Sequence, residues 1–248
     1  VQLRTWADPT TVRDWLAGQG IVRSFSMDAQ VSVERVPNDQ YYNLMYGLEN
    51  TGQSGGTVDA DIDAASAWDR TTGNSSTVVA IIDTGIQYTH PDLAPNMWVN
   101  PGEIAGDGID NDANGFVDDV HGFDFYNSDG DPMDDHYHGT HVAGTIGAKG
   151  NNSIGVVGIN WDAQLMAVKF LNSQGSGFLS DAVLSVNYVT MMRERGTNVR
   201  VINASFGGGG YDGTMASAIT RFGDVGGLFV AAAGNDAANV DVSPAYPA

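Results

Sequence analysis

The sequence contains no cysteine among its 248 residues. A disulfide framework and a cysteine-ligated zinc site are therefore both excluded, and stability must come from core packing and from any ions that bind. Long apolar runs are missing as well. Residues 77–82 and 228–233 are the best of them, and they fall far short of the roughly 18 residues that a membrane-spanning helix needs. We therefore expect no membrane partner.

Basic residues are scarce: Lys and Arg total 11 against 30 Asp and Glu, and the formal net charge is −19 at pH 7. A charge of this sign repels a phosphate backbone and an anionic membrane surface, which argues against nucleic acid as a partner. Apolar residues make up 42% of the chain, and its length suffices to bury one sizeable core. These figures predict one main domain with appendages.

Glutamate is scarce too, because 26 of the acidic residues are Asp and only 4 are Glu. Ten of these Asp lie within residues 107–135, a window that holds no Lys or Arg. Asp combined with Gly and Asn favours turns and supplies the hard oxygen ligands that calcium prefers. The window therefore predicts either a metal site or a solvated acidic loop.

Residues 110–119 follow the opening of an EF-hand loop, with Gly115 at the sharp turn. His121 occupies the twelfth place, where an EF-hand has a bidentate Glu, so we expect a weaker site or a differently closed loop. The pattern predicts bound calcium. Its ligands would be the side chains of Asp110, Asp112, Asn114 and Asp118 and the carbonyl of Phe116.

Continuous apolar runs that end in Gly or small polar residues are typical of strands buried on both faces of a parallel sheet. Helical patterns alternate with them. The sequence thus predicts an α/β fold, a doubly wound, mostly parallel sheet with helices on both faces. The predicted strands lie within residues 77–85, 163–171, 198–207 and 226–235, and the predicted helices within residues 141–148, 180–196 and 215–226.

Residues 1–36 read as a separate small piece. Residues 8–20 have the pattern of a capped amphipathic helix, and residues 30–36 alternate like a strand. Residues 61–69 predict a further short capped helix. We therefore divide the chain into residues 1–36 and 37–248.

Polar side chains lie at or near the ends of three of the predicted elements. Asp83 ends the first apolar run, His138 opens a helix of small residues, and Asn235 follows the last run. Ligands of open parallel sheets bind at the carboxyl ends of the strands, so the three are candidates for one site. A carboxylate can orient an imidazole, and an amide can stabilise an oxyanion. Helix capping, turn formation and backbone hydrogen bonding are their alternative roles.

The motifs IIDTGIQYTHPDL (residues 81–93), HGTHVAGTIGA (138–148) and VAAAGN (230–235) strongly resemble the subtilase family of serine endopeptidases in order and spacing. Residues 175–189 and 201–208 extend this resemblance, which covers roughly residues 37–248. It implies that Asp83 is the triad aspartate, that His138 is the general base, and that Asn235 is the oxyanion-hole donor.

The same resemblance implies an extended polypeptide substrate and bound calcium. Two backbone edges would pair with the substrate as added strands, namely Gly175, Ser176 and Gly177 on one side and Ser205, Phe206 and Gly207 on the other. A second calcium site would use Asp39, Asp92, Gly150, Asn152, Ile154 and Val156.

The nucleophile of the family is a Ser in a GTSMA-like helix start downstream of the oxyanion Asn. No such motif follows Asn235 in this sequence, and GTMASA at residues 213–218 precedes it, so Ser217 is not a candidate. We therefore expect a catalytic domain cut before its nucleophile and inactive by itself. Residues 1–36 would be the C-terminal part of an inhibitory propeptide, or a linker, and a propeptide implies a secreted, extracellular enzyme.

Two other functions remain open at this point. His136, His138 and His141 have the HxHxxH spacing of some zinc hydrolases. However, no His or Cys follows His141, and Thr140 stands where those enzymes usually carry Asp. The other alternative is a non-catalytic, calcium-binding relative of the proteases.

Overall fold

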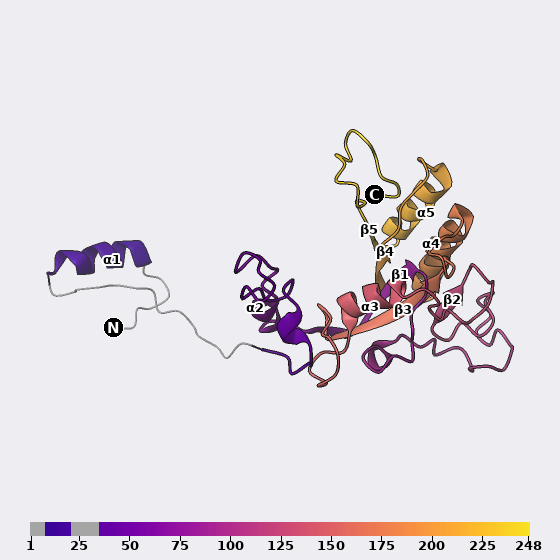
Figure 1. The fold of residues 1–248 in the computed structure, drawn as a ribbon, viewed down its shortest axis with the longest axis horizontal. Coiled ribbons are helices and arrows are strands. Elements are labelled where there is room, and N and C mark those ends of the chain that lie inside the picture. The colour runs from indigo at the N-terminus through magenta and orange to yellow at the C-terminus, as the bar shows by residue number, and fades with distance from the viewer. Residues whose placement is uncertain (1–7, 21–34) are drawn as a thin grey trace. The chain divides into compact units, whose positions relative to one another are not determined.

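The computed structural model describes residues 8–20 and 35–248 (Figure 1). The chain separates into two compact units, residues 1–33 and 34–248. In the first unit, α1 (Pro9–Gly18) confirms the predicted helix, and Asp8 caps it by accepting a hydrogen bond from the backbone N–H of Thr11 at 2.9 Å. Most of the predicted strand at 30–36 lies outside the described residues.

The second unit is built on a parallel sheet, as predicted. In the described residues the sheet has five strands in the order β2-β3-β1-β4-β5, and every pairing is parallel. Because β1 is central and the chain crosses from one side of it to the other, a crevice is expected at the carboxyl end of β1. The strands are β1 (Gly73–Asp83), β2 (Gly122–Asp124), β3 (Asp162–Lys169), β4 (Val199–Ala204) and β5 (Leu228–Ala231).

Both faces of the sheet are covered, which explains the continuous apolar runs. Alternate residues of β1 enter different cores: Val78, Ala80 and Ile82 join one, and Val79 and Ile81 join the other. The first core is closed by α4 (Leu179–Glu194) and α5 (Gly213–Asp224), which contact each other, and the second by α3 (His138–Gly147) (Figure 1). Helices on both faces confirm the predicted architecture.

Strand β2 was not predicted, because three residues are too few to show a hydrophobic period. Its first residue, Gly122, has φ +124°, and a Cβ there would lie 1.8 Å from the carbonyl oxygen of Ala167. Only glycine allows the backbone to approach β3 this closely. The strand is therefore specified by one residue rather than by a pattern.

Three short elements complete the fold. The predicted helix at 61–69 is present as α2 (Ala64–Trp68), but Asp63, which precedes it, makes no side-chain cap because it has φ 52°. Its Trp68 is buried and donates from Nε1 to the carbonyl of Ile159 at 2.9 Å. The other two elements are the 3₁₀ helices η1 (Tyr42–Leu44) and η2 (Ala94–Asn96).

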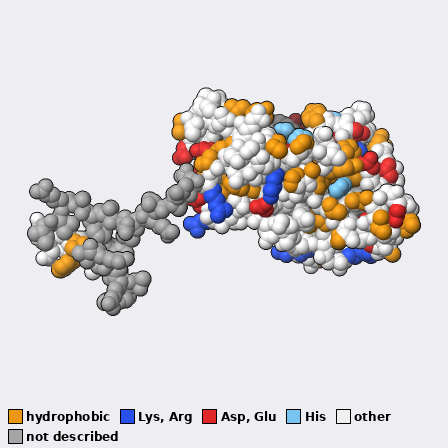
Figure 2. All heavy atoms as spheres, turned by 90° about the horizontal axis from the view of Figure 1, so that it is seen from below, with side chains coloured by type: hydrophobic (Ala, Val, Ile, Leu, Met, Phe, Trp, Pro, Cys, Tyr) orange, Lys and Arg blue, Asp and Glu red, His pale blue; other side chains and the backbone are white. Residues whose placement is uncertain are grey.

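None of the helices in the described part of the chain combines the length and the hydrophobicity needed to cross a membrane. On the face of the molecule shown in Figure 2, the few basic side chains that are described lie apart from one another.

Candidate active site

Asp83 and His138 meet at the carboxyl edge of the sheet, although 55 residues separate them. Asp83 ends β1 and is fully buried, and His138 opens α3. The Nδ1 atom of His138 lies 2.8 and 3.0 Å from the two carboxylate oxygens of Asp83. Since a carboxylate can only accept, Nδ1 carries the proton and Nε2 is left as a proton acceptor. The imidazole is 43% exposed, so this acceptor can reach a substrate.

Close packing of α3 onto the end of β1 brings this pair together. The backbone N–H of Gly139 donates to Oγ1 of Thr84 at 2.9 Å. A Cβ at Gly139 would lie 2.1 Å from the carbonyl oxygen of Gly85 and 3.2 Å from Asp83. The glycine in the HGTH motif is therefore required for the first turn of α3 to rest on the turn that carries Asp83.

Asp134 holds the loop before α3, although the sequence pattern indicates no role for it. Its carboxylate accepts from the hydroxyl of Thr84 at 2.9 Å and from the backbone N–H groups of His136, Tyr137 and Thr140 at 2.9 to 3.0 Å. Burial raises the pKa of Asp134, but hydrogen bonds from the Thr140 hydroxyl and from the three N–H groups outweigh burial and lower the pKa below the ordinary 3.8. The only sequence signal is the pair of Asp residues just before HYHGTH.

His138 lines a groove with a volume of about 920 Å³. The apolar residues that line the groove include Phe170, Leu171, Met215 and Ile219. The structure brings both predicted substrate edges to this groove, so Gly175, Ser176, Gly177, Ser205, Phe206 and Gly207 all line the same space as His138.

Asn235 is placed differently. It follows β5, at the same edge of the sheet as Asp83, because the carboxyl ends of parallel strands share one edge. It is exposed, and it is not among the described residues that line the groove. Its predicted contact with a reacting carbonyl stays a prediction.

The three histidines of HYHGTH do not form a metal centre in the described structure. His138 is engaged by Asp83, His141 is exposed, and the ring of His136 stacks on Tyr137 with centroids 4.4 Å apart. Among the described residues, the group whose ligand atoms converge within 4.8 Å is Glu103, Asp112 and Asp119, and it contains no His. The spacing that suggested zinc is therefore not matched by a cluster of imidazole nitrogens.

Two buried acids face the loop at residues 150–156. Asp39 is 6% exposed, and its Oδ2 accepts from the backbone N–H of Asn151 at 2.7 Å, while its Oδ1 has no partner. Asp92 is 1% exposed and accepts from the Asn152 amide at 2.8 Å and the Val156 N–H at 2.9 Å. Burial, together with the charge of Asp92, raises the pKa of Asp39. A buried pair of acids with an orphaned oxygen fits a cation that takes oxygen ligands.

In the acidic window, three of the predicted calcium ligands accept hydrogen bonds from the backbone, and their binding of calcium stays a prediction. The carboxylate of Asp110 accepts from the N–H groups of Asn114 and Gly115 at 3.0 and 2.8 Å. That of Asp118 accepts from residues 106 and 108 at 2.8 and 3.0 Å, and Oδ1 of Asn114 accepts from the N–H of Phe116 at 2.7 Å. These side chains thus shape the loop.

Of the predicted set, Asp112 is the one that joins other acids, Glu103 and Asp119. Asp119 is fully buried, and burial raises its pKa to about 6 although Tyr188 donates to it at 2.6 Å. Oδ1 of Asp112 has no hydrogen bond and lies 3.3 Å from the guanidinium of Arg195. Negative charge gathered in this way also fits a divalent cation. Glu103 lies outside the Asp-rich window at 107–135, and Asp119 directly follows a predicted ligand.

Comparison with known proteins agrees with this fold. Residues 74–248 match the family model Peptidase_S8, the subtilase family. The chain is 39% identical over 199 residues to "Subtilisin-like protease 1" of Plasmodium berghei, covering 80% of this chain and 31% of that protein. It is 34% identical over 252 residues to "Extracellular protease" of Xanthomonas campestris pv. campestris, covering 96% and 41%. It is 34% identical over 213 residues to "Thermitase" of Thermoactinomyces vulgaris, covering 86% and 61%.

The match defines the class of the protein as a subtilisin-like α/β peptidase. The chain belongs to the subtilase family, a family of serine proteases, and the resemblance seen in the sequence is confirmed. The chain spans less than a third of the length of the Plasmodium relative.

Proposed function

We propose that these residues carry the acid–base half of a serine endopeptidase that hydrolyses peptide bonds in extended polypeptides. The observation that carries this proposal is the Asp83–His138 pair, which opens onto a groove of about 920 Å³. Nε2 of His138 would take the proton of an attacking serine hydroxyl and later give it to the leaving amine. The buried carboxylate of Asp83 would orient the ring and stabilise the imidazolium.

The nucleophile is proposed to come from a serine that the 248 residues do not contain. Support comes from the coverage of the relatives, because the matched residues span 31% of the Plasmodium protein and 61% of Thermitase. Ser217, in the similar string GTMASA, lies in α5, and its hydroxyl donates to the carbonyl of Gly213 at 2.7 Å. The chain alone is then inactive, because the base has no hydroxyl to activate.

Substrate would bind as an extended strand between the edges at 175–177 and 205–207. Main-chain pairing of this kind grips a polypeptide with little regard to its side chains. Support comes from the groove, because both edges line it together with His138. Asn235 would donate to the oxyanion that develops on the scissile carbonyl.

Calcium is proposed at two places. The first would use the side chains of Asp39, Asp92 and Asn152 with carbonyls of the loop at 150–156, and is supported by the orphaned Oδ1 of Asp39. The second would use Glu103, Asp112 and Asp119, supported by their convergence within 4.8 Å. Bound calcium would supply positive charge to carboxylates that burial otherwise destabilises.

We further propose that the protein is secreted and that residues 1–36 are the C-terminal part of an inhibitory propeptide. Support comes from a relative named "Extracellular protease", with which the alignment covers 96% of this chain. A synthetic peptide of residues 1–36 should then inhibit the mature enzyme. Hydrolysis that is unchanged at saturating peptide would contradict this role.

The function is tested by comparing the 248-residue chain with the full gene product. The full product should cleave a fluorogenic peptide and bind a serine-directed fluorophosphonate, whereas the 248-residue chain should do neither. Hydrolysis by the 248-residue chain would contradict the proposed source of the nucleophile. A folded full product that binds calcium but neither cleaves nor reacts would favour the non-catalytic alternative.

A further inference from the structure

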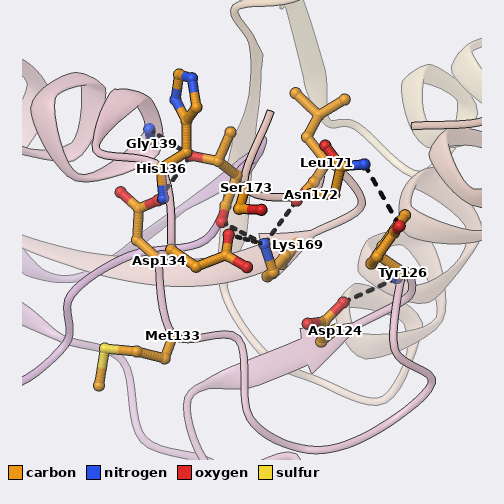
Figure 3. Close-up of polar contacts among 12 residues, drawn as sticks. Asp124, Tyr126, Met133, Asp134, His136, Gly139, Lys169, Leu171, Asn172 and Ser173 are labelled. Atoms are coloured by element: carbon orange, nitrogen blue, oxygen red, sulfur yellow. Dashed lines mark hydrogen bonds and ion pairs between the residues drawn. The ribbon is translucent and has the colours of Figure 1, made fainter. Parts of the chain in front are cut away.

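A fully buried lysine lies beside the Asp83–His138 pair. Lys169 ends β3, is 1% exposed, and has all three ammonium protons engaged (Figure 3). Its Nζ donates to the carbonyl of Thr84 at 2.9 Å, to the carbonyl of Leu171 at 2.6 Å and to Oδ1 of Asp135 at 2.7 Å. A buried ammonium is tolerated only when paired and hydrogen-bonded in this way.

The three acceptors belong to three different parts of the candidate active site. Thr84 directly follows Asp83, Asp135 lies three residues before His138, and Leu171 begins the segment that leads to the substrate edge at 175–177. In return, the carbonyl of Asp83 accepts from the N–H groups of residues 170 and 171 at 3.1 and 3.3 Å. One side chain thus connects the segments that carry the carboxylate, the imidazole and the edge of the groove.

Lys169 also donates hydrogen bonds to two backbone carbonyls that have no partner strand in the sheet. Residues 84 and 171 lie beyond the ends of β1 and β3, so their carbonyl oxygens face the edge of the sheet rather than a neighbouring strand. A buried carbonyl without a partner costs about 1 to 3 kcal/mol. The ammonium of Lys169 donates a hydrogen bond to each of these two carbonyls, and a side chain without donors could not replace it.

We propose that Lys169 is a positioning residue for peptide hydrolysis, holding the Asp83–His138 pair and the substrate edge at 175–177 in one fixed register. This inference rests on the proposed function. Lys169 itself touches neither the reacting atoms nor the imidazole; it acts through Thr84, Leu171 and Asp135. A displacement of about 1 Å between a substrate and its catalytic groups can lower a rate about 100-fold, so loosening this connection should be visible in catalysis.

Lys169 also lies near a second acid, which is buried in the core. Asp124 pairs in register with Lys169 across β2 and β3 and is fully buried. Burial raises the pKa of Asp124, and the nearby charge of Lys169 opposes that rise. Removing the lysine charge therefore also removes a counter-charge from the core, and a loss of stability has to be separated from a loss of positioning.

The test uses four variants of the full gene product. Lys169→Met removes the donors, Lys169→Arg keeps a cation with several donors, and Asp135→Asn keeps the lysine but removes its ionic partner. Lys149→Met is the matched control, because Lys149 forms an ion pair with Asp162 in which both side chains are partly exposed. Each variant is assayed well below its own melting temperature, with a long peptide that reaches residues 175–177 and a short one that does not.

If Lys169 positions the catalytic pair and the substrate edge, Lys169→Met should have a kcat/KM about 100-fold below that of the wild type. Its kcat should be reduced on both peptides, and its KM should be raised on the long peptide only. Lys169→Arg should recover roughly tenfold of that loss, Asp135→Asn should lose about tenfold, and Lys149→Met should stay within about twofold. A folded Lys169→Met with wild-type kcat and KM would overturn the proposal and leave a purely structural lysine. If Lys169→Met does not fold, wild-type kinetics of both Lys169→Arg and Asp135→Asn would overturn it.

A readout that needs no turnover separates this inference from the proposed function. In ¹⁵N-histidine-labelled protein, the Nδ1–H proton of His138 should give a sharp signal in the wild type and in Lys149→Met. The signal should broaden or vanish in Lys169→Met. A wild type that holds this signal but cleaves no peptide refutes the protease proposal. A signal unchanged in Lys169→Met refutes the role of Lys169.

Discussion

The carboxyl edge of the sheet and the acidic loops both bury charge, but they compensate it differently. At the sheet edge, Asp83 is contacted by His138 and by the N–H of Thr84, and Lys169 has three acceptors. In the loops, buried acids face other acids. Asp39 lies near Asp92 with one oxygen unpartnered, and Glu103, Asp112 and Asp119 converge.

The difference indicates two uses for a buried carboxylate. Where the protein supplies its own counter-group, the carboxylate is fixed in one geometry and can direct a proton. Where acids gather and the protein supplies less positive charge than they carry, an ion from outside would balance the remainder, and such a site would act in stability. The largest effects of mutation on rate should therefore fall at the sheet edge, and the effects of calcium should fall in the loops.

The largest expected effect is at the Asp83–His138 pair. In the full gene product, Asp83→Asn should lower kcat on the order of 10⁴-fold and His138→Ala on the order of 10⁶-fold, as in other serine proteases with this triad. His141→Ala is the matched control, because His141 is exposed on the same helix. Steady-state kinetics measures the loss, and a His138→Ala enzyme that keeps the wild-type kcat would contradict the assignment.

The next effect concerns Asn235. Asn235→Ala should lower kcat by about 10² to 10³, with little change in KM, because the amide would stabilise charge that exists only in the transition state. Asn239→Ala, in the same exposed segment, is the control. Equal losses in kcat for the two variants would show that the segment matters and that Asn235 has no special role.

Calcium should raise the free energy of unfolding through the acidic loops and not through the sheet edge. At a concentration 100 times the dissociation constant, calcium should stabilise the fold by about 2.7 kcal/mol per site, and EGTA should remove this, as scanning calorimetry can measure. Asp39→Asn and Glu103→Gln should each reduce the stabilisation. Asp110→Asn should reduce calcium affinity less than Glu103→Gln, because the carboxylate of Asp110 accepts hydrogen bonds from a backbone turn. A larger loss of affinity in Asp110→Asn would favour the EF-hand ligands predicted from the sequence.

The smallest expected effect is the pH dependence of Asp134. Its pKa is lowered below 3.8 in the folded state, so it stabilises the fold above pH 4, and the contribution is lost as pH falls through the lowered pKa. Asp134→Asn should cost roughly 1 to 2 kcal/mol near neutral pH, and the difference from the wild type should shrink below pH 4. Urea unfolding at several pH values measures this. A difference that stays constant down to pH 2 would exclude the charge as its cause.

The sheet edge and the grouping of Asp39 and Asp92 with the loop at 150–156 were largely predictable from the sequence, whereas the contacts within the acidic window were not. The strands around Asp83 are marked by apolar runs, and the helix at His138 follows a specific motif, so the sequence alone places both. Lys169 could not be predicted, because its role depends on three segments meeting at one point. The spacing of Asp110 and Asp118 predicts calcium ligands, which stays a prediction, but it did not reveal that their carboxylates accept from backbone N–H groups. The spacing of residues in a loop indicates which side chains lie close to one another. It does not indicate which hydrogen-bond donor each carboxylate oxygen contacts.

Fluorophosphonate labelling of the full gene product, followed by peptide mapping, shows which serine His138 activates. We expect one labelled serine outside residues 1–248, with labelling that is lost in His138→Gln and retained in His141→Gln. Labelling of a serine within these 248 residues, or labelling that does not depend on His138, would contradict this expectation.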